Sequence, residues 1–301
     1  MNQEAMNTLA TLDYILMTHC GGMGKWQVKN SFFVLLVFFA SLYPLFITVF
    51  TTYAPEHRCY IEQCDLDNQT VLTDWLSFAI PRQESSSNFL AGLKSYDSCT
   101  RYERIADGCT ENSFNTSKII QCEHYVYNFY YFDQTLATIH DLVCQDEFKT
   151  QLLNSILMLG LLIGSIVGGR LGDKFGRKNT MLIASFILIP VTLGSGFVPS
   201  YASYAFLRWV TCVCMPIVWV NNIVYMLETF TPKGRMFVSV TQYCPIYYFI
   251  VALIVYLSID WSFIHIGTAI ACCSFIPACF FIPESPRWLA QNNRYDEAYE
   301  V

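Results

Sequence analysis

The sequence predicts an all-α polytopic membrane protein, and three observations support that fold class. Hydrophobic residues make up 53% of the 301 residues and charged residues only 14%, with a mean hydropathy of +0.34, outside the range of soluble globular proteins. Several apolar runs reach the roughly 20 residues that a helix needs to cross a bilayer. The net charge of −6 argues against a nucleic-acid-binding protein, which needs a basic face.

Six apolar runs are candidate membrane spans, with the lipid bilayer as their surroundings. They lie near 32–53, 151–169, 180–198, 204–227, 236–258 and 262–282. The first run is too long for the apolar region of a signal peptide and follows Glu4 and Asp13, so we expect a retained helix. The predicted organisation is a cytoplasmic segment 1–30, a first helix 31–53, an outer block 54–149, helices two to six within 150–283, and the start of a cytoplasmic loop at 284–301.

Lysine and arginine in short loops predict the orientation. The loops 170–179 and 229–235 are basic, whereas the loops near Pro199 and Asp260 contain no basic residue. Because basic loops resist translocation, we expect both termini to be cytoplasmic in a multi-pass protein of the plasma membrane. The block 54–149, with 7 basic and 15 acidic residues and hence a net charge of −8, is then extracellular.

Cysteine usage agrees with an outer block in an oxidising compartment. Six of the 13 cysteines fall in this block and predict a disulfide framework, for which fifteen pairings are possible: Cys59, Cys64, Cys99, Cys109, Cys122 and Cys144. The two glycosylation sequons, at Asn68 and Asn115, lie in the same block. The other cysteines have no zinc-site spacing, so we expect small packing residues and no metal.

One string after the second span carries the most specific signal. It reads Gly-Gly-Arg-Leu-Gly-Asp-Lys-Phe-Gly-Arg-Lys over 168–178. Glycines permit a tight turn and close helix approach, while an acidic and a basic group there could form a latch that opens and closes. The alternative is an ordinary basic loop. The candidate latch residues are Gly172, Asp173, Gly176, Arg177 and Lys178.

Two further charged sites lie at the inner ends of the predicted spans, where acidic and basic groups could make a contact. Glu228 and Arg235 lie at the two ends of one short inner turn, where a solvated loop pair is the alternative. The string Pro-Glu-Ser-Pro-Arg-Trp-Leu closes the sixth span at 283–289 and contributes Glu284 and Arg287. Its prolines stop the helix, and its charged and aromatic residues suit the membrane interface.

These strings resemble those of a known family. The 168–178 string resembles the loop signature of the major facilitator superfamily, and the 283–289 string with the large outer block is similar to the organic cation, anion and zwitterion transporter family. The resemblance implies two inverted three-helix units that form the N-terminal half of a twelve-span fold. It also implies that Glu228 and Arg235 repeat the first latch in the second unit, so these two residues, with Glu284 and Arg287, are candidates for gating. Because the substrate site of such proteins lies between the halves, we expect a fragment or a half-transporter that pairs with a second chain or a full-length relative.

The fourth and fifth spans supply candidate substrate-binding residues. Arg208, Cys212, Met215, Trp219 and Asn222 recur at spacings of 4, 3, 4 and 3, which places them on one helical face. The resemblance implies that Trp219 and Gln242 face a central cavity, where an aromatic face suits an organic cation or a flat amphiphile. The candidates are Trp219, Gln242, Arg208 and Asn222. The alternatives to substrate binding are that neighbouring carbonyls satisfy Arg208 and that Trp219 is packed in the bundle or faces lipid.

The predicted function is transport of small organic ions by alternating access. The sequence lacks a phosphate loop, a zinc-protease helix and a nucleophile elbow, so we expect neither an enzyme nor a cofactor. The alternative is a non-transporting six-span protein that binds a partner through its outer block or regulates a full-length relative. The charge of the substrate and the coupling ion stay open.

Overall fold

The computed structural model describes residues 25–65, 75–82, 96–128, 134–230, 232–242, 249, 252–253, 256 and 261–300. Asn68, the segment before residue 25 and most of the fifth apolar run lie outside the described residues. The chain divides into two compact units, one formed by 1–48, 155–258 and 262–301 and the other by 49–154 and 259–261. We call them the helical unit and the disulfide unit.

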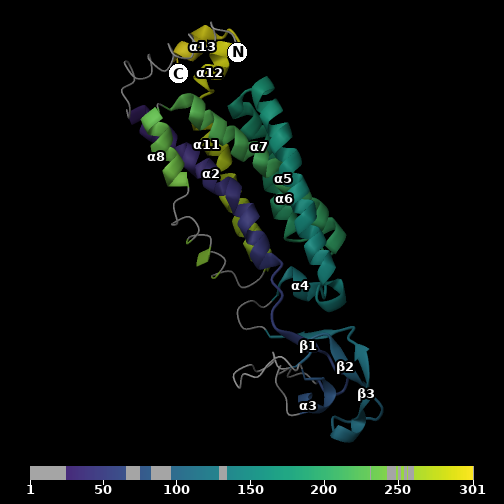
Figure 1. Cartoon of the computed structure of the whole chain (residues 1–301). Helices are drawn as coiled ribbons and strands as arrows, with labels where there is room; N and C mark the ends of the chain where they lie inside the picture. Colours follow the sequence, from purple (N-terminus) through teal and green to yellow (C-terminus); the bar gives the residue numbers. More distant parts are fainter. Residues whose placement is uncertain are drawn as a thin grey trace. The chain divides into compact units, whose positions relative to one another are not determined.

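Helices build the helical unit (Figure 1). They are α2 (Lys25–Thr51), α5 (Glu147–Phe175), α6 (Arg177–Ser195), α7 (Tyr201–Thr229), α8 (Pro232–Gln242), α10 (Trp261–Cys273), α11 (Phe275–Phe281), α12 (Pro286–Gln291) and α13 (Tyr295–Glu300). Within the described part of the chain, five helices are long and apolar enough to cross a membrane. They confirm the prediction of a helical membrane protein.

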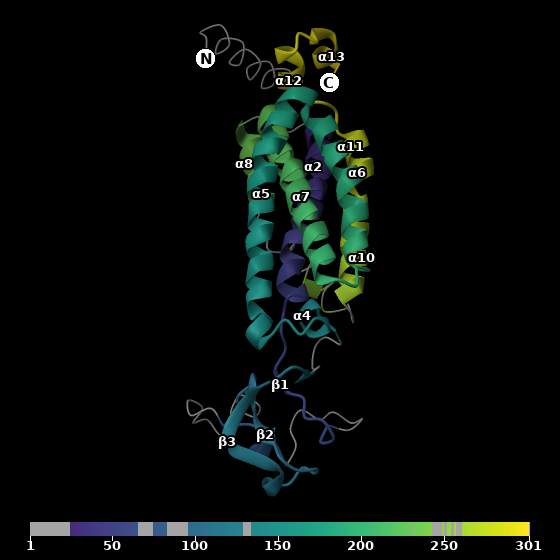
Figure 2. The same ribbon diagram turned by 90° about the vertical axis from the view of Figure 1, so that its right-hand side faces the viewer.

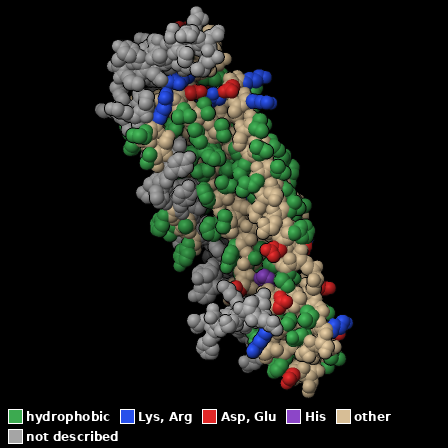
Figure 3. Space-filling model, viewed as in Figure 1, with side chains coloured by type: hydrophobic (Ala, Val, Ile, Leu, Met, Phe, Trp, Pro, Cys, Tyr) green, Lys and Arg blue, Asp and Glu red, His purple; other side chains and the backbone are tan. Residues whose placement is uncertain are grey.

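The surface of the helical unit fits a lipid environment. Only 28% of the most apolar window of α5 is buried, and its outward side chains include Met158, Leu162 and Ile166, each more than half exposed. Figure 3 shows hydrophobic side chains along the bundle and Lys, Arg, Asp and Glu gathered at the end beside α12. In water this much apolar surface would be unfavourable, whereas in a bilayer it is the expected exterior.

Helix α7 has contacts with several other helices of the unit, and Figure 2 shows it between α5 and α6. Glycines on α5 allow the closest approach, because an added Cβ at Gly164 would lie 2.2 Å from the carbonyl oxygen of Val213. The facing pairs along this seam are Gly160 with Trp209, Gly164 with Val213, and Gly168 with Ile217. Such small-residue seams are typical of membrane helix pairs.

Two helix boundaries differ from the expected spans. Helix α5 continues to Phe175, beyond the apolar run that ends near residue 169, because its polar last turns still form helical hydrogen bonds. The sixth run is split into α10 and α11 at Ser274. Pro277 explains the split, since its ring would clash with the carbonyl of Cys273 one turn earlier in a continuous helix.

The disulfide unit contains short strands that the sequence analysis did not predict. Its elements are β1 (His57–Cys59), α3 (Leu76–Ala79), β2 (Thr100–Arg104), β3 (Phe114–Gln121), β4 (Tyr125–Tyr127) and α4 (Leu136–Ile139). Strand β1 pairs antiparallel with β4, and β2 pairs antiparallel with β3 with an irregularity after Tyr102. Two-stranded sheets this short need additional support.

Three disulfides supply that support. The pairs are Cys59–Cys122, Cys64–Cys109 and Cys99–Cys144. A buried ion pair between Arg58 and Asp65, with nitrogen and oxygen 2.6 Å apart, lies beside Cys59, and the Arg58 guanidinium stacks over the Trp75 ring at 5.1 Å. The small apolar core therefore depends on covalent links and one satisfied charge pair.

Loss of the Cys59–Cys122 disulfide is expected to destabilise the disulfide unit by about 2–5 kcal/mol, because the bridge closes a long loop of the unfolded chain. The two cysteines are 63 residues apart in sequence. Thermal unfolding of the Cys59→Ser/Cys122→Ser variant measures the effect, with the exposed free thiol at Cys273 replaced by serine as the control. Equal stability of the two variants would contradict this expectation.

Candidate functional site

A charged cluster at one end of the helical unit joins four helices. We call it the Arg177 cluster and define it by Asp173 at the end of α5, Arg177 at the start of α6, Glu228 at the end of α7, and Glu284 and Trp288 before and within α12. These residues come from segments up to 115 positions apart in the sequence. The fold therefore assembles the site from four separate helix ends.

Arg177 is the centre of this cluster. Its guanidinium Nη1 lies 2.7 Å from Asp173 Oδ1 and its Nη2 lies 3.1 Å from Glu228 Oε1. A third contact joins Nε to Glu228 Oε2 at 3.4 Å. The Arg177 side chain is 8% exposed and that of Glu228 17%, whereas Asp173 is 73% exposed. The pair with Glu228 is thus shielded from water and stronger than a surface ion pair.

Glu284 binds the backbone at the start of α6. Its Oε1 accepts hydrogen bonds from the amides of Arg177 at 2.9 Å and Lys178 at 3.2 Å, where the helix dipole favours a negative charge. Trp288 completes this connection, because its indole Nε1 donates to the Asp173 carbonyl at 2.9 Å. The segment after the sixth span is therefore fastened to the turn between α5 and α6.

Gly176 makes this turn possible. It is the single residue between α5 and α6, and its φ is +94°, a conformation that favours glycine. An added Cβ would also lie 2.4 Å from Glu284 Oε2. Both the backbone conformation and the space for the carboxylate therefore require glycine at this position.

The structure brings together most of the predicted latch residues. Asp173, Gly176, Arg177, Glu228 and Glu284 meet in the Arg177 cluster, and Lys178 contributes its backbone amide. The carboxylate of Glu228, at the end of α7, contacts Arg177 at the start of α6. Arg235 and Arg287 are half-buried in α8 and α12. The sequence analysis expected the aromatic residue of the 283–289 string, Trp288, at the membrane interface and did not predict its bond to Asp173.

The predicted substrate-binding residues lie deeper in the helical unit. Arg208 is fully buried, and its Nη2 donates to the carbonyl of Pro44 at 2.8 Å and also contacts the Thr48 hydroxyl. Asn222 is 1% exposed and donates to the Val34 carbonyl at 2.9 Å. Both residues connect α7 to α2. The side chain of Gln242 lies outside the described residues.

Trp219 differs from these two residues. Its side chain is partly exposed, and its indole Nε1 is buried and has no hydrogen-bond partner in the described part of the chain. An indole N–H usually finds a partner when it is buried.

A buried histidine network lies on another part of α7, and the sequence analysis did not predict it. His265 Nδ1 lies 3.0 Å from Ser195 Oγ, and its Nε2 lies 3.4 Å from the Tyr204 hydroxyl. The Ser195 hydroxyl donates to the Thr192 carbonyl at 2.7 Å, so it accepts from the Nδ1–H of His265. The network connects α6, α7 and α10.

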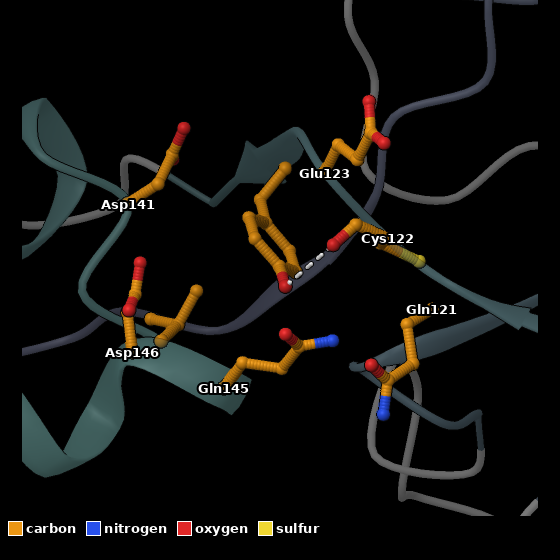
Figure 4. Close-up of a pocket in the computed structure, with 8 residues that line it drawn as sticks. Gln121, Cys122, Glu123, Asp141, Gln145 and Asp146 are labelled. Atoms are coloured by element: carbon orange, nitrogen blue, oxygen red, sulfur yellow. Dashed lines mark hydrogen bonds between the residues drawn. The ribbon is translucent and has the colours of Figure 1, made fainter.

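The disulfide unit contains a cavity of about 460 Å³ with acidic walls (Figure 4). Glu123, Asp141 and Asp146 line it, together with Tyr125, whose hydroxyl donates to the Cys122 carbonyl at 3.1 Å. Asp141 Oδ1 also accepts from the buried Tyr127 hydroxyl at 2.8 Å. Burial, and then this carboxylate, raise the pKa of Tyr127 far above its usual value.

Several helices that are long and apolar enough to cross a membrane define a multi-pass membrane protein. Comparison with known proteins identifies the family. The model of the sugar (and other) transporter family matches residues 109–301. The chain belongs to this family. The predicted membership of the major facilitator superfamily, with its helical membrane fold, is confirmed.

The curated relatives are organic cation transporters or members of solute carrier family 22 by name. They include the organic cation transporter-like protein of Drosophila melanogaster, 26% identical over 92% of this chain and 48% of its own length, and solute carrier family 22 member 6-B of Xenopus laevis, 26% identical over 94% and 51%. Solute carrier family 22 member 4 of Mus musculus is 27% identical over 84% and 46%. The resemblance to the organic cation and anion transporters is thus confirmed, and the chain spans about half the length of these relatives.

Among solved structures, the xylose transporter XylE from E. coli in a partially occluded inward open conformation is similar to part of the chain. The matched region covers 51% of this chain and 43% of the XylE chain, with 17% sequence identity and a TM-score of 0.45.

Proposed function

We propose that this chain forms the N-terminal six-span half of a transporter that moves small organic ions across the plasma membrane by alternating access. The single observation that carries the proposal is the Arg177 cluster, which fastens four helix ends through contacts that can separate without unfolding a helix. Membership of the sugar (and other) transporter family supports it. The acidic and basic partners would close one face of the protein and release when the helices move.

We place the Arg177 cluster on the cytoplasmic side, with both termini. Basic side chains near this bundle end include Lys29, Arg170, Lys174 and Lys178, and Figure 3 shows Lys and Arg concentrated there. Positive charge in short loops favours the cytoplasm. The disulfide unit is then extracellular, where its disulfides persist and where Asn115 could be glycosylated.

Trp219 is the strongest of the four candidate substrate-binding residues, because its indole N–H has no partner in the described part of the chain. Arg208 and Asn222 bond to α2, so we propose that they shape the cavity wall. Gln242 remains a candidate that would face Trp219. An organic cation would gain cation–π attraction from the indole, and a flat anion would gain stacking and a hydrogen bond.

Uptake by the native protein, expressed from its own gene, tests this function. We expect saturable uptake of at least one of tetraethylammonium, benzoate and carnitine, and we expect Trp219→Ala to reduce it about tenfold or more, the loss of one stacking contact and hydrogen bond. Phe206→Ala is the control, since Phe206 lies on the same helix and is 61% exposed. Equal uptake by both variants would show that Trp219 does not line the substrate cavity.

The second candidate function is partner binding without transport. The acidic cavity of the disulfide unit favours it, because a cavity of about 460 Å³ can hold part of a ligand or a basic side chain. This candidate would be supported against the transporter if a partner bound saturably to the disulfide unit in membranes while none of the three probes was taken up.

A further inference from the structure

Asn221 lies on α7 beside the Arg177 cluster and is fully buried. Its Nδ2 donates to two carbonyl oxygens, that of Gly168 on α5 at 2.9 Å and that of Ile217 on α7 at 2.7 Å. Because two acceptors face one side of the side-chain amide, that side must be the NH₂ group. The orientation of the amide is therefore fixed, and Oδ1 points the opposite way.

The oxygen of this amide lies against Gly172, next to Arg177. An added Cβ at Gly172 would be 1.7 Å from Asn221 Oδ1 and 2.8 Å from Arg177 Nη1. The two groups thus approach the same point on α5. Within the described residues, Oδ1 accepts no hydrogen bond, although a buried acceptor without a donor is costly.

The position of Asn221 on its helix links it to Glu228. The two residues are seven positions apart, which is close to two helical turns and places them on one face of α7. On the facing helix, Gly168 and Gly172 are four apart, and Asp173 follows directly. The bond from Asn221 to the Gly168 carbonyl therefore joins α7 to α5 within about two helical turns of Glu228 and of Asp173.

We propose that Asn221 is a positioning residue of the Arg177 cluster. It holds α5 at the register in which Arg177 reaches both Asp173 and Glu228, and its Oδ1 accepts an N–H of Arg177 when the Arg177–Glu228 pair separates. The guanidinium then keeps a hydrogen-bond acceptor in both states of the latch. The second step rests on the proposed gating function, whereas the first step concerns the closed cluster alone.

Amide hydrogen–deuterium exchange of the native protein in lipid nanodiscs tests the proposal at the start of α6, where the Thr180 amide donates to the Gly176 carbonyl. We expect Asn221→Ala to raise exchange over residues 177–180 about fivefold or more, the equivalent of one lost hydrogen bond. Asn222→Ala is the matched control, because Asn222 is equally buried but bonds to α2. It should change this exchange less than about twofold.

A double-mutant cycle separates positioning from simple packing. If Asn221 acts through Arg177, Asn221→Ala should add less than about twofold in an Arg177→Gln background, because coupled residues are not additive. The proposal would be overturned if the double variant raised exchange by the product of the two single effects. It would also be overturned if Asn222→Ala raised exchange as much as Asn221→Ala. Hydrogen–deuterium exchange is measured without any transport. A protein with no uptake would therefore refute the proposed function, whereas the exchange result for Asn221 would still stand.

The Asn221→Asp variant keeps the side-chain shape and tests the positioning step if Asn221→Ala fails to fold. Its carboxylate cannot donate, so both bonds from the NH₂ group, to the Gly168 and Ile217 carbonyls, are lost. We expect exchange over 177–180 to rise about fivefold or more, as in Asn221→Ala. Exchange at the wild-type rate would show that these bonds do not position the cluster and would overturn the proposal.

Discussion

Replacement of Gly164 by alanine is expected to destabilise the helical unit by about 2–4 kcal/mol, as overpacking of a tight contact does. The added Cβ would lie 2.2 Å from the carbonyl oxygen of Val213 and 3.0 Å from its carbonyl carbon. Both atoms belong to the backbone of α7, so no side-chain rotation relieves the clash. Helices α5 and α7 would have to separate.

Gly169→Ala is the matched control for this prediction. Gly169 lies on the same helix, and an added Cβ there meets nothing within 4 Å. Because alanine favours a helix interior over glycine by about 0.8–1 kcal/mol, this variant should be as stable as wild type or slightly more. Thermal unfolding of purified protein in detergent gives the comparison, and equal midpoints for the two variants would contradict the packing described for this seam.

Arg177→Lys is expected to weaken the Arg177 cluster by about 1.5–3 kcal/mol, although the charge is conserved. Arginine reaches Asp173 and Glu228 at once through separate nitrogen atoms, whereas a lysine ammonium is a single compact charge. The carboxylate of Glu228, only 17% exposed, would lose part of the hydrogen bonding that compensates the burial of its charge. Hydrogen–deuterium exchange over residues 177–180 should rise about tenfold or more, since 1.4 kcal/mol corresponds to a factor of ten.

Arg294→Lys provides the comparison at the same end of the molecule. Arg294 contacts Glu297 through two nitrogen atoms, but the side chains are 47% and 53% exposed, and exposed pairs of this kind contribute less than about 1 kcal/mol. We expect little change in this variant. If Arg177→Lys behaved in the same way, the burial of the Arg177 cluster would have no energetic consequence.

The helices of the fold could be predicted from the sequence because the requirement is local. A run of about 20 apolar residues in a bilayer must form a helix to satisfy its backbone hydrogen bonds. Pairing information is not local. Six cysteines allow fifteen pairings, and the pair Cys59–Cys122 depends on the contact between β1 and β4, which no periodicity indicates.

The candidate site could be predicted only in part, for a related reason. The charges of the 168–178 string identified Arg177 and Asp173 because they lie four residues apart on neighbouring helix ends. Glu228 and Glu284 are 51 and 107 residues from Arg177, and only the packed bundle brings them together. Asn221 and Asn222 are adjacent in sequence, and the arrangement of α2 and α5 around α7 decides which one faces the cluster.

Exchange at the Arg177 cluster with and without substrate tests the central claim most directly. The measurement is hydrogen–deuterium exchange over residues 177–180 of the native protein in nanodiscs, with saturating tetraethylammonium, benzoate or carnitine. The gating account predicts that at least one of these probes changes the exchange about threefold or more, and that Trp219→Ala removes the change. Unchanged exchange with every probe, in a protein that still takes one of them up, would show that the cluster is a fixed structural contact and contradict its role as a gate.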